Sequence, residues 1–393
     1  MATEVTQHRW AQKYPELGTE PLPVEPYVSE KYFELEREKI FRRVWLNIGS
    51  IDDCANPGDY FVRELAVCNA SVLVMHDRDG GIQAFHNVCS HRGNKLVWAS
   101  HGSTKAYLGC CFHGWTYDLK GCLRGVMDEG NFAPLPKDDL GLTPIRTAVW
   151  KKFIFVNFDP DGTETLEEYL GPPAVSLEDV PLEKIPLRWR YDVPERANWK
   201  IALDAQDEIY HLPVLGPVHD SAARLYTTTE EGFTRLSLFE RLGKHNLWST
   251  DMNPEYESIG LEKLLFEKAP PAEIELPTRG EIFDFYRIFP NFVIGLLAGS
   301  VFTYNFWPLA VDQTVWEIRL HAPQPRDAAD LMFQHYSKGK FRDTLAEDIA
   351  GHENTHAGLA SRAKSSFFLQ DDEIQIRSFH KTLHEYVDPA EVL

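Results

Sequence analysis

The sequence is poor in cysteine, with six among 393 residues. Such a number does not supply a framework of disulfide bridges, so the chain has to fold around an apolar core. Hydrophobic residues make up 43% of the chain, which is enough for two domains of ordinary size. Residues 1–20 lack the apolar run of a secretory signal, and we therefore expect a cytoplasmic protein.

Positive charge is also scarce. The chain carries 40 lysines and arginines against 59 acidic residues, which gives a net charge of −19. No basic run or basic tail interrupts this balance, and a surface of this sign repels nucleic acid and anionic membranes. We expect neither of them as a partner.

The sequence lacks a convincing membrane-spanning segment. Residues 288–311 contain no charged residue and are long enough to cross a bilayer. However, Pro290 and Gly295 interrupt the segment, and it is rich in Phe, Val, Tyr and Trp. This composition favours two buried strands joined by a turn near Gly299 and Ser300.

Hydrophobic periodicity divides the chain into a helical lead-in over 1–44, a β domain over 45–158 and a larger domain over 159–393. In the β domain apolar residues recur with period two, and Gly80 and Gly81 mark a hairpin between two of the strands. The larger domain mixes a helix predicted at 198–212, strands within 233–320 and helices within 327–384. Strands and helices without βαβ alternation indicate the α+β class.

Two short segments of the β domain each place a cysteine beside a histidine. Cys89-x-His91 and Cys110-x-x-His113 are separated by eighteen residues. Two thiolates and two imidazoles can hold a structural zinc ion in tetrahedral geometry. They can also hold a [2Fe–2S] cluster in which both histidines bind one iron. The ligand types alone leave both possibilities open.

The residues around these ligands resemble the Rieske domain of ring-hydroxylating oxygenases. Arg92-Gly93 follows the first pair, and Gly114-Trp115 follows the second. The resemblance implies a Rieske [2Fe–2S] cluster held by Cys89, His91, Cys110 and His113. It also implies that the loop glycines admit backbone N–H groups to the sulfurs and that Trp115 shields the cluster.

Two departures from common Rieske patterns are visible. Cys111 occupies a position where the oxygenase family usually has proline, and the x-x-His spacing selects its neighbour Cys110 as the ligand. Respiratory Rieske proteins carry an additional cysteine in each loop, at positions that correspond to Asn94 and Phe112. Neither is a cysteine here, so the resemblance is to the oxygenase type, which has the lower potential.

A second group of residues resembles the iron-binding segment of the same family. It consists of Asn198-Trp199-Lys200, then Glu208-x-x-His211, then His219. A non-haem Fe(II) centre needs two histidines and one carboxylate. The resemblance implies His211 and His219 as the histidines, although seven residues separate them where the family usually has four. It implies Asp348, in a late helix, as the carboxylate, with Glu347 and Glu353 as alternatives.

Glu208 stands where the family usually has an aspartate that links an iron ligand to a Rieske histidine of a neighbouring subunit. Its position three residues before His211 would place both side chains on one face of the predicted helix. Asp207, four residues before His211, is the competing candidate for this role.

Together the motifs imply the terminal (alpha) component of a Rieske non-haem iron oxygenase. Its expected architecture is a small antiparallel β Rieske domain and a helix-grip-like α+β catalytic domain with a central antiparallel sheet. The chain has no dinucleotide fingerprint, so electrons from NADH or NADPH have to arrive through a separate reductase, possibly with a ferredoxin. The family's electron path between subunits leads us to expect a homotrimer, possibly with a beta subunit.

The expected reaction is the oxidation of a small molecule by O2 at the mononuclear iron. Residues 288–307 predict an aromatic pocket wall, which favours a hydrophobic, aromatic substrate, as in aromatic hydrocarbon catabolism. Dihydroxylation, monohydroxylation and oxidative demethylation use the same iron site. Glu208, where the family usually has aspartate, favours monooxygenation.

Two other functions compete with this interpretation. A Rieske electron carrier would use its second domain for binding alone. A zinc hydrolase would use the motif His352-Glu353-Asn354-Thr355-His356, whose histidines share one face of a helix. The second alternative has no recognisable third ligand downstream and leaves the Cys-His loops unexplained.

Overall fold

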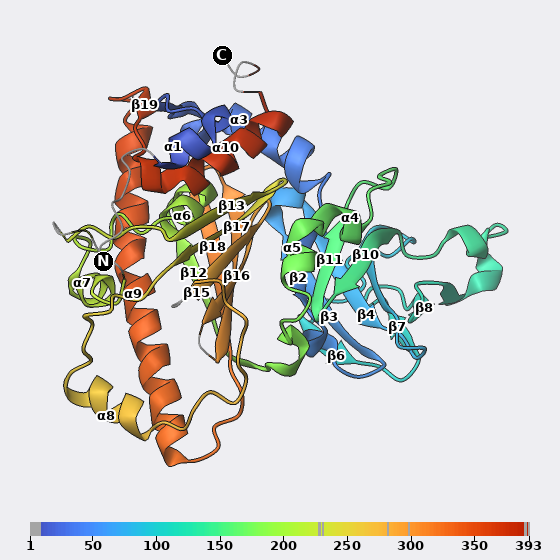
Figure 1. The fold of residues 1–393 in the computed structure, drawn as a ribbon. Helices are drawn as coiled ribbons and strands as arrows, with labels where there is room; N and C mark the ends of the chain where they lie inside the picture. Colours follow the sequence, from blue (N-terminus) through green and yellow to red (C-terminus); the bar gives the residue numbers. More distant parts are fainter. Residues whose placement is uncertain are drawn as a thin grey trace. The chain divides into compact units, whose positions relative to one another are not determined.

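The structure, a computed structural model, describes residues 9–226, 229, 232–280, 283–297, 299–388 and 391. The contacts within the chain separate two compact units (Figure 1). One contains residues 37–169, and the other combines residues 9–36 with the chain from Leu170 onward. No helix in the described ranges is both long enough and apolar enough to cross a membrane.

The unit over 37–169 is built from two antiparallel sheets. Seven strands follow the spatial order β2-β11-β10-β5-β4-β3-β6, and three short strands form a second sheet in the order β7-β8-β9. The predicted hairpin at Gly80 and Gly81 joins β4 to β5, and Gly80 has a φ of +87°. These sheets confirm the small antiparallel β domain. The strands are β2 (Leu46–Ser50), β3 (Asp59–Leu65), β4 (Ala70–His76), β5 (Ile82–His86), β6 (His101–Ser103), β7 (Tyr107–Gly109), β8 (Thr116–Asp118), β9 (Leu123–Gly125), β10 (Pro144–Trp150) and β11 (Phe153–Asn157).

The second unit is organised around one antiparallel sheet of seven strands, in the order β12-β18-β17-β16-β15-β14-β13. The predicted strand pair within 288–311 is present as β16 and β17, with Leu297 paired to Ser300 across the turn and Gly299 at a φ of +73°. With its flanking helices this sheet confirms the α+β class. The strands are β12 (Leu187–Glu195), β13 (Leu238–Leu242), β14 (His245–Thr250), β15 (Phe283–Ile288), β16 (Phe292–Leu297), β17 (Ser300–Ala310) and β18 (Gln313–His321).

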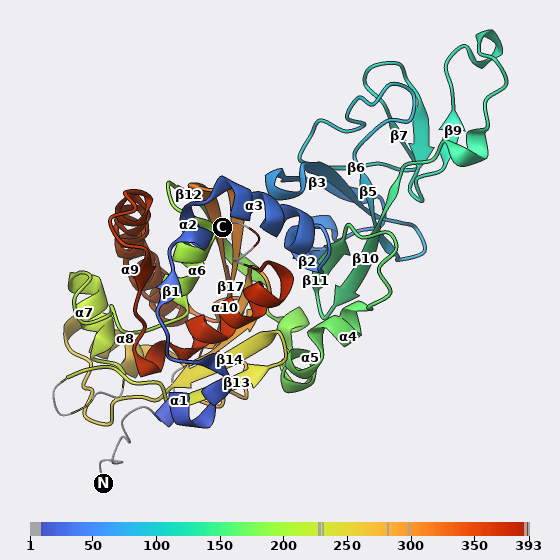
Figure 2. The same cartoon turned by 90° about the horizontal axis from the view of Figure 1, so that it is seen from above.

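Helix α9 (Ala328–Ala360) runs along one face of this sheet (Figures 1 and 2). Alternate residues of β17 point toward it, and the Phe302 ring lies 5.3 Å from the Phe341 ring of α9. On the same face, Phe306 stacks on Trp316 of β18 at 5.4 Å. The long helix is therefore held against the sheet by aromatic side chains.

Helix α6 (Trp199–Gln206) shows why the Asn-Trp-Lys sequence occurs at its start. The Asn198 side chain accepts a hydrogen bond from the backbone N–H of Lys200 and so caps the helix. The Trp199 indole and the Lys200 ammonium both donate to Glu36, at 3.1 and 2.7 Å, and the ion pair is fully buried. Glu36 ends α3 (Glu30–Glu36), so residues 9–36 of the predicted lead-in belong to the same unit as α6, whereas residues 37–44 belong to the unit over 37–169.

The helix predicted over 198–212 is shorter than expected. It ends at Gln206, and Asp207 to Leu215 follow as turns. The physical reason lies in Asp207, whose carboxylate accepts hydrogen bonds from Arg287 on β15 and from the Trp248 indole on β14. Because this buried pairing draws the chain toward the sheet, Glu208 and His211 leave the helix and do not share a helical face.

Candidate metal centres

The two Cys-His loops of the Rieske-like unit have the same backbone geometry. In the first, the N–H of Gly93 donates to the carbonyl of Cys89, and in the second the N–H of Gly114 donates to that of Cys110. Gly93 and Gly114 have φ values of +74° and +71°, where a residue with a Cβ is strained. The glycines are therefore needed to close two matching turns.

The side chains of these loops converge in a manner that suits an iron–sulfur cluster. Cys89 and Cys110 are buried, and the rings of His91 and His113 lie 4.6 Å apart. Nδ1 of His91 is buried without a hydrogen-bond partner among the described residues, as expected of an atom that binds a metal. Trp115 stacks on His91 with ring centroids 4.9 Å apart, in keeping with its predicted shielding role.

Two residues that the sequence did not single out as functional contact the cysteines. The Tyr117 hydroxyl lies 3.4 Å from Sγ of Cys89, and the Asn94 amide lies 3.9 Å from Sγ of Cys110. Tyr117 also accepts a hydrogen bond from the backbone N–H of Ser90. Cys111, by contrast, is exposed, which fits the choice of Cys110 as the ligand.

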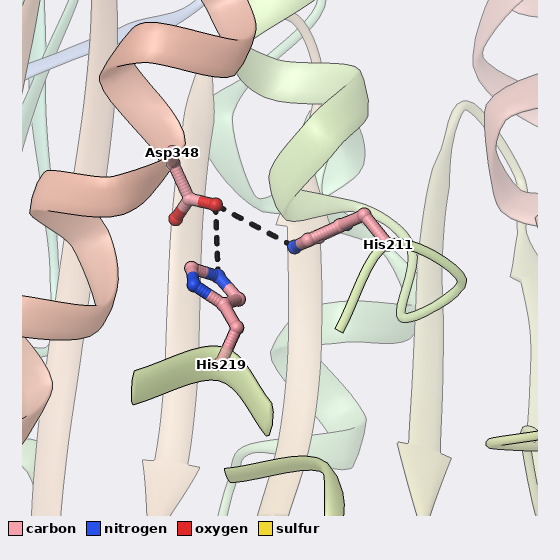
Figure 3. A group of neighbouring side chains, drawn as sticks. All are labelled: His211, His219 and Asp348. Carbon is pink, nitrogen blue, oxygen red and sulfur yellow. Dashed lines mark ion pairs between the residues drawn. The ribbon is translucent and has the colours of Figure 1, made fainter. Parts of the chain in front are cut away.

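In the second unit, His211, His219 and Asp348 come together although their sequence positions span 138 residues (Figure 3). One potential ligand atom from each lies within 4.8 Å of the other two. Oδ1 of Asp348 is 3.0 Å from Nε2 of His219 and 3.5 Å from Nε2 of His211. The same Oδ1 is buried and accepts no hydrogen bond from the described residues. Two imidazoles and one unsatisfied carboxylate oxygen fit a 2-His-1-carboxylate iron site.

The second nitrogen of each histidine is held by a glutamate. Glu208 binds Nδ1 of His211, and Glu347 lies 2.8 Å from Nδ1 of His219. The other oxygen of Asp348 accepts a hydrogen bond from the Gln206 amide at 2.8 Å. Such outer contacts orient metal ligands and raise their basicity. Glu347 therefore supports a ligand, which leaves Asp348 as the carboxylate at the centre.

The lengthened spacing between the histidines is accommodated by α7 (Pro217–Ala223), which carries His219. Glu347 accepts the backbone N–H groups of Val218 and His219 and so satisfies the start of this helix. Gly216 lies directly before it, and a Cβ there would approach the Glu347 carboxyl to 2.4 Å. Glycine at this position lets the chain pass close to Glu347 and brings His219 back to the centre.

The electrostatics of the centre favour a cation. Burial alone would lower the pKa of both histidines, but the carboxylates of Glu208 and Asp348 outweigh it for His211 and raise its pKa. For His219 the carboxylates of Asp348 and Glu347 outweigh the effect of burial, and the pKa of His219 is raised as well. Acids that stabilise a proton on each of two histidines also stabilise a divalent metal ion that binds these histidines in place of the protons.

The predicted acid pair divides between two roles. Glu208 contacts His211, as described, whereas Asp207 is fully buried in its pairing with Arg287 and Trp248. Within the described part of the chain, Asp207 forms no hydrogen bond or ion pair with His211 or His219. The geometry is that expected of a linking acid for Glu208 and of a structural ion pair for Asp207.

The histidines of the His-Glu-x-x-His motif are occupied elsewhere. Nδ1 of His352 lies 2.9 Å from Glu195, and Nδ1 of His356 accepts the backbone N–H of Asn198. Glu353 pairs with Arg196. Within the described part of the chain these two histidines belong to no three-ligand group. The arrangement therefore offers no support for a zinc hydrolase.

A cavity of about 380 Å³ adjoins His211 and Asp348. Four of the residues that line it are acids, and its other walls are mostly apolar. None of the described lining residues is a lysine or an arginine. The acids are Asp204, Glu208, Asp348 and Glu373, and the apolar walls come from Ile201, Leu215, Leu359, Phe367, Phe368, Leu369 and Ile376.

A cluster of aromatic side chains surrounds Tyr304 of β17, and none of them belongs to the described lining of the cavity. Burial, followed by the charge of Asp348, raises the pKa of Tyr304 well above its usual value. Around it, Phe302 lies 4.8 Å and Phe341 6.3 Å from the Tyr304 ring. Phe285 completes the group, 6.4 Å from Tyr304.

Comparison with known proteins identifies both units. The family model described as "Ring hydroxylating alpha subunit (catalytic domain)" matches residues 183–389, and the model "Rieske [2Fe-2S] domain" matches residues 44–136. The second match includes both Cys-His loops, and the first includes His211, His219 and Asp348. The resemblance stated from the motifs is thereby confirmed.

Curated relatives are about one-third identical to this chain over the aligned part, which is about half of each relative. The carnitine monooxygenase oxygenase subunit of Escherichia coli (strain K12) is 32% identical over 199 residues, which cover 50% of this chain and 52% of that protein. The chloroplastic choline monooxygenase of Spinacia oleracea is 31% identical over 214 residues, 52% of this chain and 47% of that protein. The chain thus spans about half the length of these relatives.

A solved structure matches the whole fold. It is that of a quaternary ammonium Rieske monooxygenase, with a TM-score of 0.76 and 20% sequence identity, and the match covers 98% of this chain and 100% of the other. At this identity the likeness concerns the fold, and it agrees with the two antiparallel architectures described above.

Proposed function

We propose a reaction and a substrate class for this chain from the premise that it belongs to the family of ring-hydroxylating alpha subunits. The reaction is a monooxygenation, in which one C–H bond, one O2, two electrons and two protons give one C–O–H group and one water. The electrons come from a separate reductase, itself supplied by NADH or NADPH. When bound, the Rieske cluster passes electrons and the mononuclear iron activates O2.

The chain's own residues would hold these groups at two places. Cys89, His91, Cys110 and His113 would hold the cluster, and His211, His219 and Asp348 would hold the iron. Glu208 and Glu347 keep the two histidines oriented, so their Nε2 atoms stay directed at the centre without reorganisation.

For the substrate we propose a small organic cation of the quaternary ammonium type. The observation that carries this is the cavity beside His211 and Asp348, which has acids and apolar walls and no lysine or arginine among its described lining. Charge attraction favours a cation there, and the apolar walls suit its alkyl groups. The aromatic residues of its lining, Tyr27, Phe367 and Phe368, support the same class, because aromatic faces attract alkylated ammonium groups.

This proposal replaces the aromatic substrate expected from residues 288–307. The aromatic residues of the lining alone would suit a neutral aromatic compound equally well. Asp204 and Glu208 favour the cationic class, because a neutral ring gains nothing from them. The other two acids add little, since Asp348 would bind the iron and burial raises the pKa of Glu373 to about 7. The names of the relatives from Escherichia coli and Spinacia oleracea, which concern carnitine and choline, point in the same direction.

We further propose that Glu208 links His211 to His91 or His113 of a neighbouring copy in a homotrimer. Glu208 lines the cavity and contacts His211, which supports its place at the end of such a link. The solved structure of the quaternary ammonium monooxygenase was reported with inter-subunit electron transfer, which supports the same arrangement. Sedimentation of the purified protein tests the trimer directly.

A matched pair of compounds tests the substrate class. Choline and 3,3-dimethylbutan-1-ol have the same shape, and only the first carries a charge. With a reductase and O2 we expect oxidation of choline, one oxygen atom in the product, and less than a tenth of that rate with the neutral compound. Equal rates, or preference for the neutral compound, would contradict the cationic class.

Metal analysis separates the oxygenase from the electron carrier. An oxygenase should hold three irons and two labile sulfides per chain, whereas a carrier should hold two irons. His211→Ala should remove the third iron and leave the visible spectrum of the cluster unchanged. Turnover by a protein with only two irons would rule out the second centre.

A further inference from the structure

Three buried polar side chains that the metal centres do not use meet beside the cavity. The Tyr27 hydroxyl, from α2 (Glu25–Val28), donates a hydrogen bond to Oδ2 of Asp204 in α6 at 2.5 Å. Nε2 of His380, from α10 (Ile374–Tyr386), lies 2.6 Å from the same hydroxyl and 3.3 Å from the same carboxylate oxygen. Three helices thus bring a carboxylate, a phenol and an imidazole into one hydrogen-bonded group.

The contacts of this group have a direction, because a hydroxyl carries only one proton. Since Tyr27 donates to Asp204, it accepts from His380, whose Nε2 then carries a proton. Burial, followed by the charge of Asp204, raises the pKa of Tyr27 well above its usual value, so the phenol stays protonated between its two partners. A hydroxyl that accepts on one side and donates on the other can pass a proton along without becoming charged.

The two ends of the group lie in different surroundings. Asp204 and Tyr27 line the cavity, and the Asp204 side chain is 12% exposed. At the other end, Nδ1 of His380 is buried and has no hydrogen-bond partner among the described residues. The ring of His384, one turn further along α10 and partly exposed, lies 6.1 Å from that of His380. The group therefore extends from the cavity toward the solvent side of α10.

We propose that His380, Tyr27 and Asp204 form a proton relay that supplies the cavity during turnover. The inference rests on the proposed function, because the monooxygenation consumes two protons for each O2 that reacts. His380 and Tyr27 act through Asp204, which is the member of the group with the largest exposed fraction at the cavity wall.

The transfer conserves protons and moves no electrons. When His380 is protonated on both nitrogens, Nε2 passes its proton to the Tyr27 oxygen while the Tyr27 proton moves to Oδ2 of Asp204. One N–H and one O–H bond break, and two O–H bonds form. Protonated Asp204 then releases one of the two protons that enter the water product, and His380 recovers a proton from solvent past His384. Burial keeps the pKa of His384 low, so near pH 7 its ring is neutral and has both a donor and an acceptor nitrogen.

A second acid in the cavity wall can hold the delivered proton. Glu373 lines the same cavity, and one of its oxygens accepts the backbone N–H of Gln370 at 2.7 Å. Burial, with the charges of Glu208 and Asp204, raises the pKa of Glu373 to about 7. A proton that enters at Asp204 therefore finds a carboxylate that binds it near neutral pH.

Tyr32 offers a matched control for Tyr27. It is also buried and lies five residues further along the lead-in, in α3. Its hydroxyl donates to the backbone carbonyl of Val387 at 3.5 Å, and it is absent from the described lining of the cavity. Replacement by phenylalanine removes one buried hydroxyl in either case. The pair of variants therefore separates loss of the relay from loss of a buried hydrogen bond.

The test follows proton uptake directly. The complete iron-loaded protein is reduced and mixed with O2 and choline in weakly buffered solution, and a fluorescent pH indicator records the protons taken from solvent in stopped flow. Tyr27→Phe should slow this uptake about 100-fold, since a positioned proton donor contributes at least that much to a rate. Its iron content and its affinity for choline should stay at the natural values. Tyr32→Phe should keep the natural rate of uptake.

A natural rate of uptake in Tyr27→Phe would overturn the inference, and so would an equal loss in Tyr32→Phe. His380→Gln, whose amide cannot relay a proton, decides in the same way if Tyr27→Phe does not fold. In the natural protein the uptake should slow in D2O, and an unchanged rate would overturn the inference whether or not either variant folds. If choline supports no turnover, the proposed cationic class fails, and the same comparison is made with reduced protein and O2 alone, whose reaction also takes up protons.

Discussion

Glu347 holds His219 by both its backbone and its ring: one carboxylate accepts the N–H of His219 at 3.0 Å and lies 2.8 Å from its Nδ1. The acid lies next to Asp348 in α9, so two successive residues of one helix contact the same histidine from opposite sides of the ring. The position of His219 is thus determined by α9 more than by its own short helix.

Glu347→Gln should weaken iron binding at the second centre by about 10- to 100-fold, because the charge that orients and polarises His219 is lost. Dialysis against a graded iron chelator, followed by metal analysis, measures this. The control is Glu353→Gln in the same helix, whose partner is the exposed Arg196. Equal iron retention by the two variants would show that Glu347 has no supporting role.

Glu208 and Asp207 should respond differently to loss of charge. Glu208→Gln is expected to keep a stable fold but to lose nearly all turnover per iron bound at the second centre, because it contacts His211 and no buried cation depends on it. Product formation with chemically reduced protein, alongside metal analysis, is the measurement. Full turnover would exclude Glu208 as the linking acid.

Asp207→Ala is expected to act on stability, because it leaves the buried Arg287 without a counter-charge. Breaking a buried ion pair in this way costs about 3–5 kcal/mol. Urea unfolding followed by tryptophan fluorescence measures the loss, and Arg287→Met in the same background should recover part of it. A variant as stable as the natural protein would show that the pair contributes nothing.

Tyr117→Phe should lower the reduction potential of the Rieske cluster. The Tyr117 hydroxyl lies 3.4 Å from Sγ of Cys89, and hydrogen bonds to sulfur stabilise the more negative, reduced state. Redox titration followed by visible absorption measures the change. Tyr107→Phe, on the neighbouring strand and largely exposed, is the control and should leave the potential unchanged. An unchanged potential in the Tyr117 variant would mean that its hydroxyl does not reach the cluster's ligand.

His384 should make the protein sensitive to mild acid. Burial, followed by the neighbouring His380, lowers the pKa of His384 to about 4 from its usual 6.5. As the pH falls from 6.5 toward 4, the unfolded chain gains a proton at this position that the folded chain does not, so stability decreases. We expect this group to cost about 1–2 kcal/mol near pH 4.5, allowing for its partial exposure, and to have no effect above pH 7.

His384→Gln removes the titrating group, so the difference in unfolding free energy between pH 7.5 and pH 5 should shrink. Lys381→Gln, an exposed change on the same helix, leaves that difference as it is. Parallel pH profiles of the natural protein and the His384 variant would contradict the assignment.

Much of the fold could be predicted from the sequence, because its signals are local. The hairpin at Gly80 and Gly81 and the turn at Gly299 are fixed by residues that tolerate a positive φ. The matching Cys-His loops owe their shape to Gly93 and Gly114 in the same way. The end of α6 could not be predicted, since it depends on the pairing of Asp207 with Arg287, eighty residues away.

The site shows the same division. His211 and Asp348 come from recognisable motifs, and the structure brings them together with His219. The outer contacts of Gln206 and Glu347 are made across 142 and 128 residues, and the sequence, which marked Glu347 only as an alternative ligand, indicated neither contact. The cavity could not be predicted either, since its acids come from α6, the turns that follow it, α9 and the chain before α10 (Ile374–Tyr386), and only folding places them around one space.

Helix α9 carries Glu347, Asp348 and His352 within six consecutive residues of a 33-residue helix. Each inserted residue would turn everything beyond it by about 100° and advance it by about 1.5 Å. A single insertion anywhere between its first turn and Glu347 would therefore rotate all three side chains away from their partners at once, even at a fully exposed position. Seven residues, close to two whole turns, would nearly restore the angle. The contacts of these three residues therefore restrict how many residues α9 can gain or lose before Glu347, although its exposed positions can vary in sequence.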